Sequence, residues 1–251
     1  MVVDVFKPFN SEMLHDLCDR CSVPSVGYQF IDIGASEGMY SNAGYHGKME
    51  VHAFEPRRNA EWELPEDRAT VYKVALSDFN GKTVFHQTIG RRRTSRLASV
   101  DRDWTNNHTW RKVEKYIVPV KKLDYYNFDR VSFIKLDVEG AELNVLKGAR
   151  ETIKRCNPAI MIEIDAHHHE TLDYLQDLNY QCVAFVARRK IFSVQGPIVF
   201  STGGGVTTWA CRSTEFNPND EYFRREHKRD KDIYNYDREL PLWGDFIFKK
   251  V

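Results

Sequence analysis

The hydrophobic pattern of the chain alternates between two kinds of segment. Short apolar runs of the type found in buried strands are followed by stretches in which apolar residues recur with helical spacing. Strands that alternate with helices in this way predict βαβ units and a mainly parallel sheet with helices on both faces. The predicted strands are residues 28–33, 50–54, 70–76, 131–136, 158–164 and 180–187. The predicted helices are residues 10–22, 39–45, 57–64, 141–155 and 170–178.

The alternation stops between residues 78 and 122, where two short strand-like runs flank a basic stretch. Residues 88–122 carry ten Lys and Arg residues against three acidic ones, a formal charge of +7 in a chain whose total is zero. We therefore expect 78–122 to be a partly antiparallel insertion into a single domain that spans residues 1–251. The last segment, 212–251, is too rich in aromatic residues for a disordered tail, so we expect it to pack on that domain.

The composition indicates an ordinary soluble globular protein, with 251 residues of which 42% are hydrophobic and 29% charged. The longest apolar run, Cys182–Ala187, has six residues, whereas a membrane-spanning helix needs about 20. The start of the chain lacks the pattern of a secretory signal, and its five scattered cysteines do not suggest disulfides. We therefore expect a cytoplasmic protein. Cys18 and Cys21 form a C-x-x-C pair after His15, but a fourth zinc ligand is missing, so reduced thiols are the favoured interpretation.

A glycine turn follows the first predicted strand, in the run Phe30-Ile-Asp-Ile-Gly-Ala-Ser-Glu-Gly38. Gly34 permits a tight turn or a close backbone approach, and Gly38 lets the next helix start near a ligand. Neither a G-x-G-x-x-G fingerprint nor a G-K-[ST] phosphate loop is present. Asp32 is badly placed for a phosphate and suits a cationic or polyhydroxylated ligand.

Glu55 ends the second predicted strand, 21 residues after Gly34. An acidic residue at this place hydrogen-bonds the ribose in nucleoside-binding sheets. Because ligands of open α/β sheets bind at the carboxyl ends of the strands, the glycine turn and Glu55 together favour an adenosine-type cofactor.

Residues 32–41 resemble the first motif of class I S-adenosylmethionine-dependent methyltransferases. The run Phe133-Ile-Lys-Leu-Asp-Val-Glu-Gly-Ala-Glu-Leu-Asn-Val-Leu-Lys-Gly-Ala149 is similar to the FkbM family in particular, as are residues 74–78 and 158–164. The resemblance spans roughly residues 28–187. It implies a Rossmann-like class I fold, with a mostly parallel seven-stranded sheet and helices on both faces, and O-methyl transfer, often to a sugar hydroxyl.

The same resemblance assigns the cofactor residues. The glycine turn would line the methionine side of S-adenosylmethionine, Glu55 would hold the ribose, and the segment 75–78 would lie by the adenine. The implied cofactor-binding residues are Asp32, Gly34, Ala35, Ser36, Gly38, Glu55, Ala75, Ser77 and Asp78.

Transfer to a hydroxyl requires a base that removes the proton of the alcohol. Asp137 and Glu163 end adjacent predicted strands, where two carboxylates can act as bases or hold Mg²⁺. Asp165 or His167 could complete either arrangement. Glu139 is a further catalytic candidate, whereas Glu142 stabilises a helix N-terminus in the simpler interpretation.

The basic stretch offers a wall for the acceptor, with Arg93, Arg96 and Trp104 as candidate binding residues. Arginines with aromatic residues suit an anionic small-molecule or glycan acceptor, and they also suit a nucleic-acid strand. The first alternative is therefore an RNA 2′-O or cap methyltransferase, although Lys135 and Asp137 share one strand and a Lys-Asp-Lys-Glu tetrad is not evident. The second alternative is a non-enzymatic binding module on the same fold.

Overall fold

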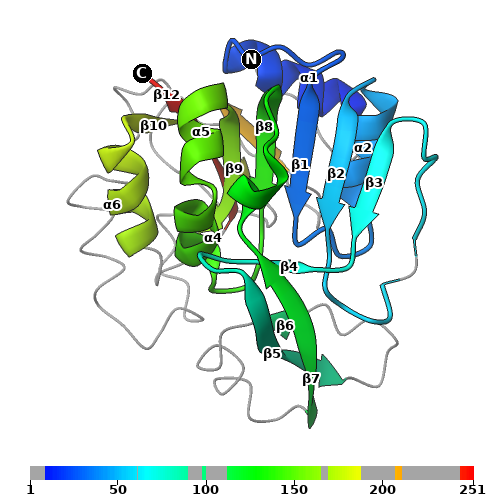
Figure 1. The fold of residues 1–251 in the computed structure, drawn as a ribbon. Coiled ribbons are helices and arrows are strands. Elements are labelled where there is room, and N and C mark those ends of the chain that lie inside the picture. The colour runs from blue at the N-terminus through cyan, green and yellow to red at the C-terminus, as the bar shows by residue number, and fades with distance from the viewer. Residues whose placement is uncertain are drawn as a thin grey trace.

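A computed structural model describes residues 9–60, 62–89, 98–99, 112–164, 169–187, 207–210 and 244–251. Within them, eight strands form the main sheet in the order β11-β10-β12-β9-β8-β1-β2-β3 (Figure 1). The strands are β1 (Gln29–Ile33), β2 (Glu50–Phe54), β3 (Ala69–Tyr72), β8 (Val131–Leu136), β9 (Ala159–Ile164), β10 (Tyr180–Ala187), β11 (Thr207–Ala210) and β12 (Gly244–Lys250).

Five neighbouring strands, from β3 to β9, pair in parallel. Strand β12 runs antiparallel to both β9 and β10, so β10 has the direction of the parallel group. Seven of the strands form the mostly parallel sheet that the family resemblance implies, and β11 adds an eighth at the edge beside β10. The predicted fold class is confirmed.

The C-terminal strand β12 was not among the predicted elements. Residues 212–243 lie outside the described part of the chain, but the last residues form a strand in the interior of the sheet. Phe246, Ile247 and Phe248 are fully buried, because helices cover both faces of the sheet at this point. A run of only three apolar residues, far from the other strands in sequence, gave no signal for this position.

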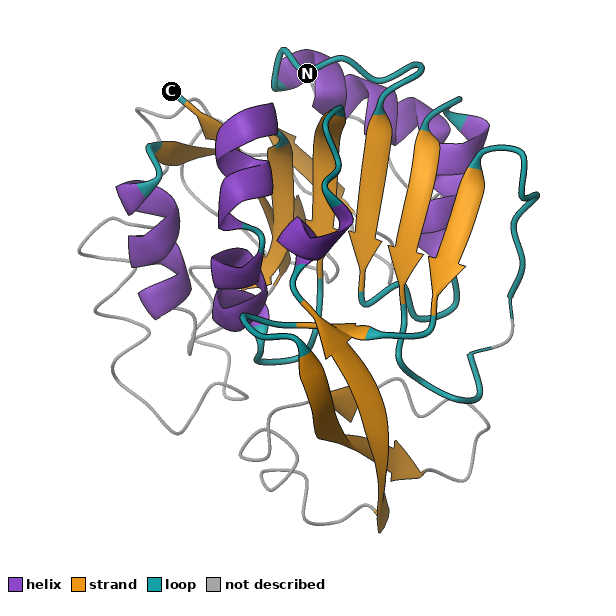
Figure 2. Cartoon of the chain, viewed as in Figure 1, coloured by secondary structure: helices purple, strands orange, loops and turns teal. Residues whose placement is uncertain are grey.

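Helices cover the two faces of the sheet (Figure 2). On one face lie α1 (Ser11–Arg20), which Asn10 caps through a 3.0 Å bond from Met13 N, and α2 (Met39–His46). On the other face lie η1 (Leu123–Tyr126), α4 (Glu142–Gly148), α5 (Arg150–Cys156) and α6 (His169–Asp177). The predicted helix 141–155 is thus interrupted at Ala149.

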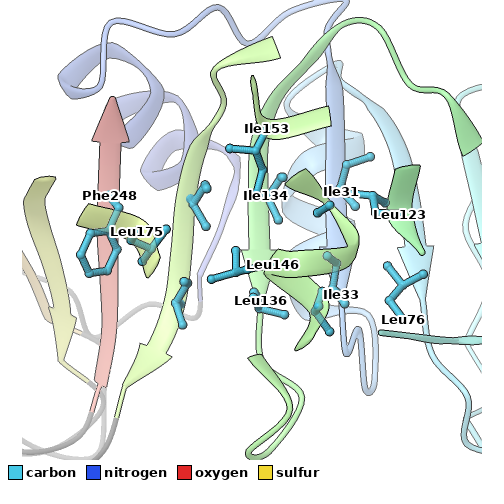
Figure 3. Packing of buried hydrophobic residues seen from close by; sticks show 14 of the residues in the cluster. Ile31, Ile33, Leu76, Leu123, Ile134, Leu136, Leu146, Ile153, Leu175 and Phe248 are labelled. Atoms are coloured by element: carbon cyan, nitrogen blue, oxygen red, sulfur yellow. The ribbon is translucent and has the colours of Figure 1, made fainter. Parts of the chain in front are cut away.

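Alternate strand residues supply two cores, as the two-residue period of a strand requires. Ile31 and Ile33 of β1 pack with Leu146 and Ile153 beneath α4 and α5 (Figure 3). Phe30 points to the opposite face, where it joins residues of α1 and α2, among them Cys18, and also Cys21, which follows α1. Burial raises the pKa of both thiols to about 12, so these cysteines are inert apolar core residues.

A smaller sheet lies at the edge where β1, β2 and β3 end (Figure 1). Its order is β4-β7-β5-β6, and β5 and β7 form a long antiparallel pair within the segment predicted as an insertion. The bounds are β4 (Ala75–Leu76), β5 (Gly81–Ile89), β6 (Ala98–Ser99) and β7 (Lys112–Lys121). That the whole chain forms one domain stays a prediction. In the part of the chain described here, no helix is long and apolar enough to span a membrane.

Candidate functional site

The loop after β1 is pressed against the end of β8. Gly34 has a φ of +76°, and a Cβ at this position would lie 1.8 Å from the Asp137 carbonyl oxygen. The Gly34 and Ala35 amides donate to the Phe54 carbonyl oxygen at 2.9 and 3.1 Å. Only glycine fits here, and its close approach brings the ends of β1, β2 and β8 together.

The segment after β2 covers this loop, and it is not the helix predicted for 57–64. Its described residues are irregular, and prolines stand at both of its ends. Trp62 lies against Gly38, and its indole Nε1 donates to the Ser36 carbonyl oxygen at 2.8 Å. Tertiary contacts with the glycine loop therefore outweigh the helical pattern of the segment.

Asp32 is fully buried at the end of β1. Its Oδ2 accepts a 2.5 Å hydrogen bond from the Ser41 hydroxyl, whereas its Oδ1 has no hydrogen-bond partner among the described residues. Burial raises the pKa of this carboxyl, and the nearby Lys135 ammonium opposes that shift. A buried carboxylate oxygen without a partner is costly, and a cationic donor on a ligand would satisfy it.

Glu55 is 4% exposed, and its carboxylate faces the glycine loop. Its Oε2 accepts from the Ser36 amide at 2.7 Å, and its Oε1 accepts from the Arg57 amide at 2.8 Å. The Arg57 guanidinium lies 3.2 Å from the same Oε1. The strand-end position of Glu55 was predictable, but no periodic pattern in the sequence pointed to Arg57 or Trp62.

The segment from Ala75 to Asp78 is wedged between α4 and β7. Ala75 and Ser77 are buried, whereas Asp78 is exposed. The Ser77 amide donates to the Lys121 carbonyl oxygen at 3.0 Å. A Cβ on Gly148 would lie 2.0 Å from the Ser77 carbonyl oxygen, so the absence of a side chain on α4 sets the position of this segment.

Gly148→Ala therefore tests the shape of the site. Helix propensity alone would favour alanine by about 1 kcal/mol. We expect a loss of stability of about 1–3 kcal/mol instead, because the added methyl group must displace the Ser77 backbone. Thermal unfolding measures this change, and Lys147→Ala, at an exposed position of the same helix, is the control. A melting temperature equal to or above that of the wild type would contradict the close approach.

Three carboxylates meet at the ends of β8 and β9. One oxygen each of Asp137, Glu139 and Glu163 lies within 4.8 Å of the other two, and all three residues are partly exposed. The structure thus brings together three predicted candidates, the pair at the ends of β8 and β9 and Glu139. Carboxylate oxygens at this separation can accept protons or hydrogen bonds from hydroxyl groups and are also the ligand type of Mg²⁺.

Lys135 connects the carboxylates with the rest of the site. Its buried ammonium lies 3.1 Å from Asp137 Oδ2 and 4.8 Å from the centre of the Tyr40 ring. The Tyr40 hydroxyl donates to Asp245 Oδ2 at 3.2 Å, and Asp245, on β12, pairs in register with Glu163. The sequence analysis did not single out Tyr40 or Asp245. Asp245 reaches the site only through the position of β12, and Tyr40 contacts Asp245 there.

The remaining predicted residues either have a structural role or lie outside the described part of the chain. Glu142 accepts hydrogen bonds from the Val138 and Gly140 amides at 3.0 Å, so it stabilises the turn before α4, as the simpler interpretation had it. Five predicted residues lie outside the described residues: Arg93, Arg96, Trp104, Asp165 and His167.

Comparisons with known proteins identify the family of the chain. The family model of the Methyltransferase FkbM domain matches residues 32–182. The 2-O-methyltransferase NoeI of Sinorhizobium fredii is 26% identical over 142 residues, which cover 50% of this chain and 58% of that protein. The chain thus matches less than two thirds of this relative's length.

Solved structures align with much of this chain at low identity. Methyltransferase FkbM from Methylobacillus flagellatus KT aligns with a TM-score of 0.42 and 22% identity, covering 73% of this chain and 43% of that one. Precorrin-6y C5,15-methyltransferase from Geobacter metallireducens GS-15 aligns with a TM-score of 0.37 and 11% identity, covering 83% and 94%. The family match covers more than half of the chain and includes the glycine loop, Glu55 and the three clustered carboxylates, so this chain belongs to the FkbM methyltransferase domain family.

Proposed function

We propose that this protein transfers the methyl group of S-adenosylmethionine to a hydroxyl of a carbohydrate acceptor. The observation that carries the proposal is a juxtaposition at one edge of the sheet. A glycine loop follows Asp32, whose buried Oδ1 has no hydrogen-bond partner among the described residues, and a cluster of three carboxylates lies next to that loop. The first feature suits a cationic nucleoside cofactor, and the second suits an acceptor with several hydroxyl groups. The 2-O-methyltransferase among the relatives supports a hydroxyl acceptor.

The residues of the glycine loop fit the cofactor. Asp32 Oδ1 would accept from the α-amino group, Glu55 would accept from a ribose hydroxyl, and Ser77 would lie beside the adenine. Asp32 carries a desolvation cost that a bound ammonium group relieves, so binding gains from its burial. When bound, the cofactor supplies a methyl group that is already activated as part of a sulfonium.

The chain's own part is then to place and deprotonate the acceptor. Correct orientation of two reactants is worth about 7–11 kcal/mol of a barrier. Asp137 would accept the proton of the attacking hydroxyl, while Glu139 and Glu163 would accept hydrogen bonds from neighbouring hydroxyls. Lys135 would hold Asp137 in place. The auxiliary base His167 and a wall formed by the basic stretch stay predictions.

Glu55→Gln tests the cofactor half. An amide presents one oxygen and one NH₂ group, so either orientation sets a donor against the Ser36 amide or against Arg57. We expect the affinity for S-adenosylmethionine and for S-adenosylhomocysteine to fall about tenfold or more, measured by calorimetric titration. Glu66→Gln, at an exposed position, is the control. If the wild-type protein bound neither compound, the proposed function would be wrong, and a binding module would replace it.

The acceptor half needs a screen of sugars, nucleotide-sugars and glycans with labelled cofactor, with RNA oligonucleotides as the competing class. Methyl transfer to a carbohydrate hydroxyl is the expected result. Turnover of RNA, with binding that weakens steeply as salt rises, would instead support the RNA methyltransferase alternative.

A further inference from the structure

Another charged residue lies buried beside the glycine loop. Arg57 is 5% exposed, although arginine is seldom buried without a partner. Its Nε lies 3.2 Å from Glu55 Oε1, and its NH2 group donates to the Ser36 hydroxyl at 3.1 Å. The rigid fork of one guanidinium therefore contacts both the acidic residue at the end of β2 and the loop that follows β1.

These contacts fix the Glu55 carboxylate almost completely. A carboxylate offers about four acceptor positions. Among the described residues, Oε1 accepts from the Arg57 amide and forms an ion pair with the Arg57 guanidinium at 3.2 Å, and Oε2 accepts from the Ser36 amide. One position, on Oε2, is therefore left for a ligand.

The other partner in this arrangement is also held in place. Ser36 has a φ of +54°, a region that residues other than glycine seldom occupy. Its amide donates to Glu55, its hydroxyl accepts from Arg57, and its carbonyl oxygen accepts from Trp62. Because the loop residue and the carboxylate restrain each other through Arg57, neither can turn without breaking charge-assisted hydrogen bonds.

We propose that Arg57 is a positioning residue of the cofactor site, which orients the Glu55 carboxylate so that its remaining acceptor position on Oε2 binds one hydroxyl of the cofactor ribose. This inference rests on the proposed function, since it takes the ligand to be an adenosine. Arg57 acts through Glu55 and Ser36 and does not need to touch the cofactor itself.

The proposal predicts unequal recognition of the two ribose hydroxyls. Only one of them can use the acceptor position on Glu55, and a hydrogen bond to a charged group is worth about a tenfold change in affinity or more. Calorimetric titration with S-adenosylhomocysteine and with its 2′-deoxy and 3′-deoxy analogues measures the difference. In the wild-type protein we expect one analogue to bind about tenfold more weakly and the other to bind within about threefold of the parent compound.

Arg57→Met should remove this discrimination. The Glu55 carboxylate would keep its two backbone amide bonds but lose the guanidinium that restrains it together with Ser36. We therefore expect the three ligands to bind within about threefold of one another, at the affinity of the weaker analogue. Arg58→Met is the matched control, because Arg58 is exposed and its guanidinium lies over the Tyr116 ring, 4.3 Å from the ring centre. That variant should keep the wild-type pattern.

Arg57→Lys provides the test if the methionine variant does not fold. A lysine keeps the buried charge, but a single ammonium cannot reproduce the fork between Glu55 and Ser36. The ratio between the two analogues should fall at least about threefold in this variant.

Four outcomes would overturn the inference. Arg57→Met could still distinguish the two analogues as the wild-type protein does, or it could bind all three ligands more weakly by the same factor. Either result would show that Arg57 stabilises the fold and does not orient Glu55 toward the ribose. Equal losses for both analogues in the wild-type protein would contradict a single acceptor position. If the wild-type protein bound no S-adenosylhomocysteine, the proposed function itself would fail, and that result is distinct from the others.

Discussion

Replacement of Asp137 by asparagine should lower kcat for methyl transfer about 10²- to 10⁴-fold, the usual effect of losing a general base. The amide cannot accept the proton of the attacking hydroxyl, yet it keeps the size of the carboxylate. Its oxygen can still accept a hydrogen bond from Lys135, whose ammonium lies 3.1 Å from Asp137 Oδ2. Initial rates with labelled cofactor measure the loss, and cofactor affinity should change by no more than a few-fold.

Asparagine is a better test than alanine at this position because Lys135 is buried. Removing one partner of a buried ion pair costs about 3–5 kcal/mol, so loss of activity in Asp137→Ala would be confounded with loss of the fold. Asp129→Asn is the control, because Asp129 is exposed and lies before β8, whereas Asp137 follows that strand. This variant should leave kcat unchanged. Full turnover in Asp137→Asn would remove Asp137 from the proposed chemistry.

The parts of the site that the sequence predicted share one property, which is a position next to a strand end. Gly34, Glu55, Asp137 and Glu163 each end or follow a strand whose apolar run is visible in the sequence. Parallel strands end at the same edge of a sheet, so predicting the strands was enough to predict that these residues lie at one edge. The structure adds the distance between the clustered carboxylates of Asp137, Glu139 and Glu163, which is at most 4.8 Å.

The residues that the sequence did not predict depend on contacts between distant segments. Asp245 reaches the site only because β12 pairs with β9, which no local pattern specified. Arg57 and Trp62 lie in a segment with a helical pattern that contacts with Ser36 hold in an irregular conformation. The energy of these tertiary hydrogen bonds exceeds the small differences in helix propensity, and sequence periodicity reports only the latter.

Glu139 has a backbone conformation that a residue with a side chain seldom adopts. Its φ is +57°, in the left-handed region, which costs a residue with a Cβ about 1–2 kcal/mol. Glycine would avoid this cost and is found at the next position, Gly140. Local strain of this kind persists where the side chain is needed, and the Glu139 carboxylate lies in the cluster with Asp137 and Glu163.

Glu139→Gly should therefore lower activity without lowering stability. Relief of the strain is partly offset by the greater entropy of a glycine in the unfolded chain, so we expect the free energy of unfolding to stay equal or rise by up to about 1 kcal/mol. Loss of one of three clustered carboxylates should lower kcat by about 10²-fold. Urea denaturation and initial rates on the same preparation measure the two effects.

Lys48→Gly is the matched control for this experiment. Lys48 has a φ of +60°, is exposed, and precedes β2, at the opposite edge of the sheet from the carboxylates. Its substitution should have the same small effect on stability and none on kcat. If Glu139→Gly kept wild-type activity, the Glu139 carboxylate would not contribute to methyl transfer. The acceptor site would then consist of Asp137 and Glu163 alone. If it lost stability by several kcal/mol, the Glu139 side chain would instead hold the loop after β8 in place, and its strained backbone would be offset by contacts that stabilise the fold.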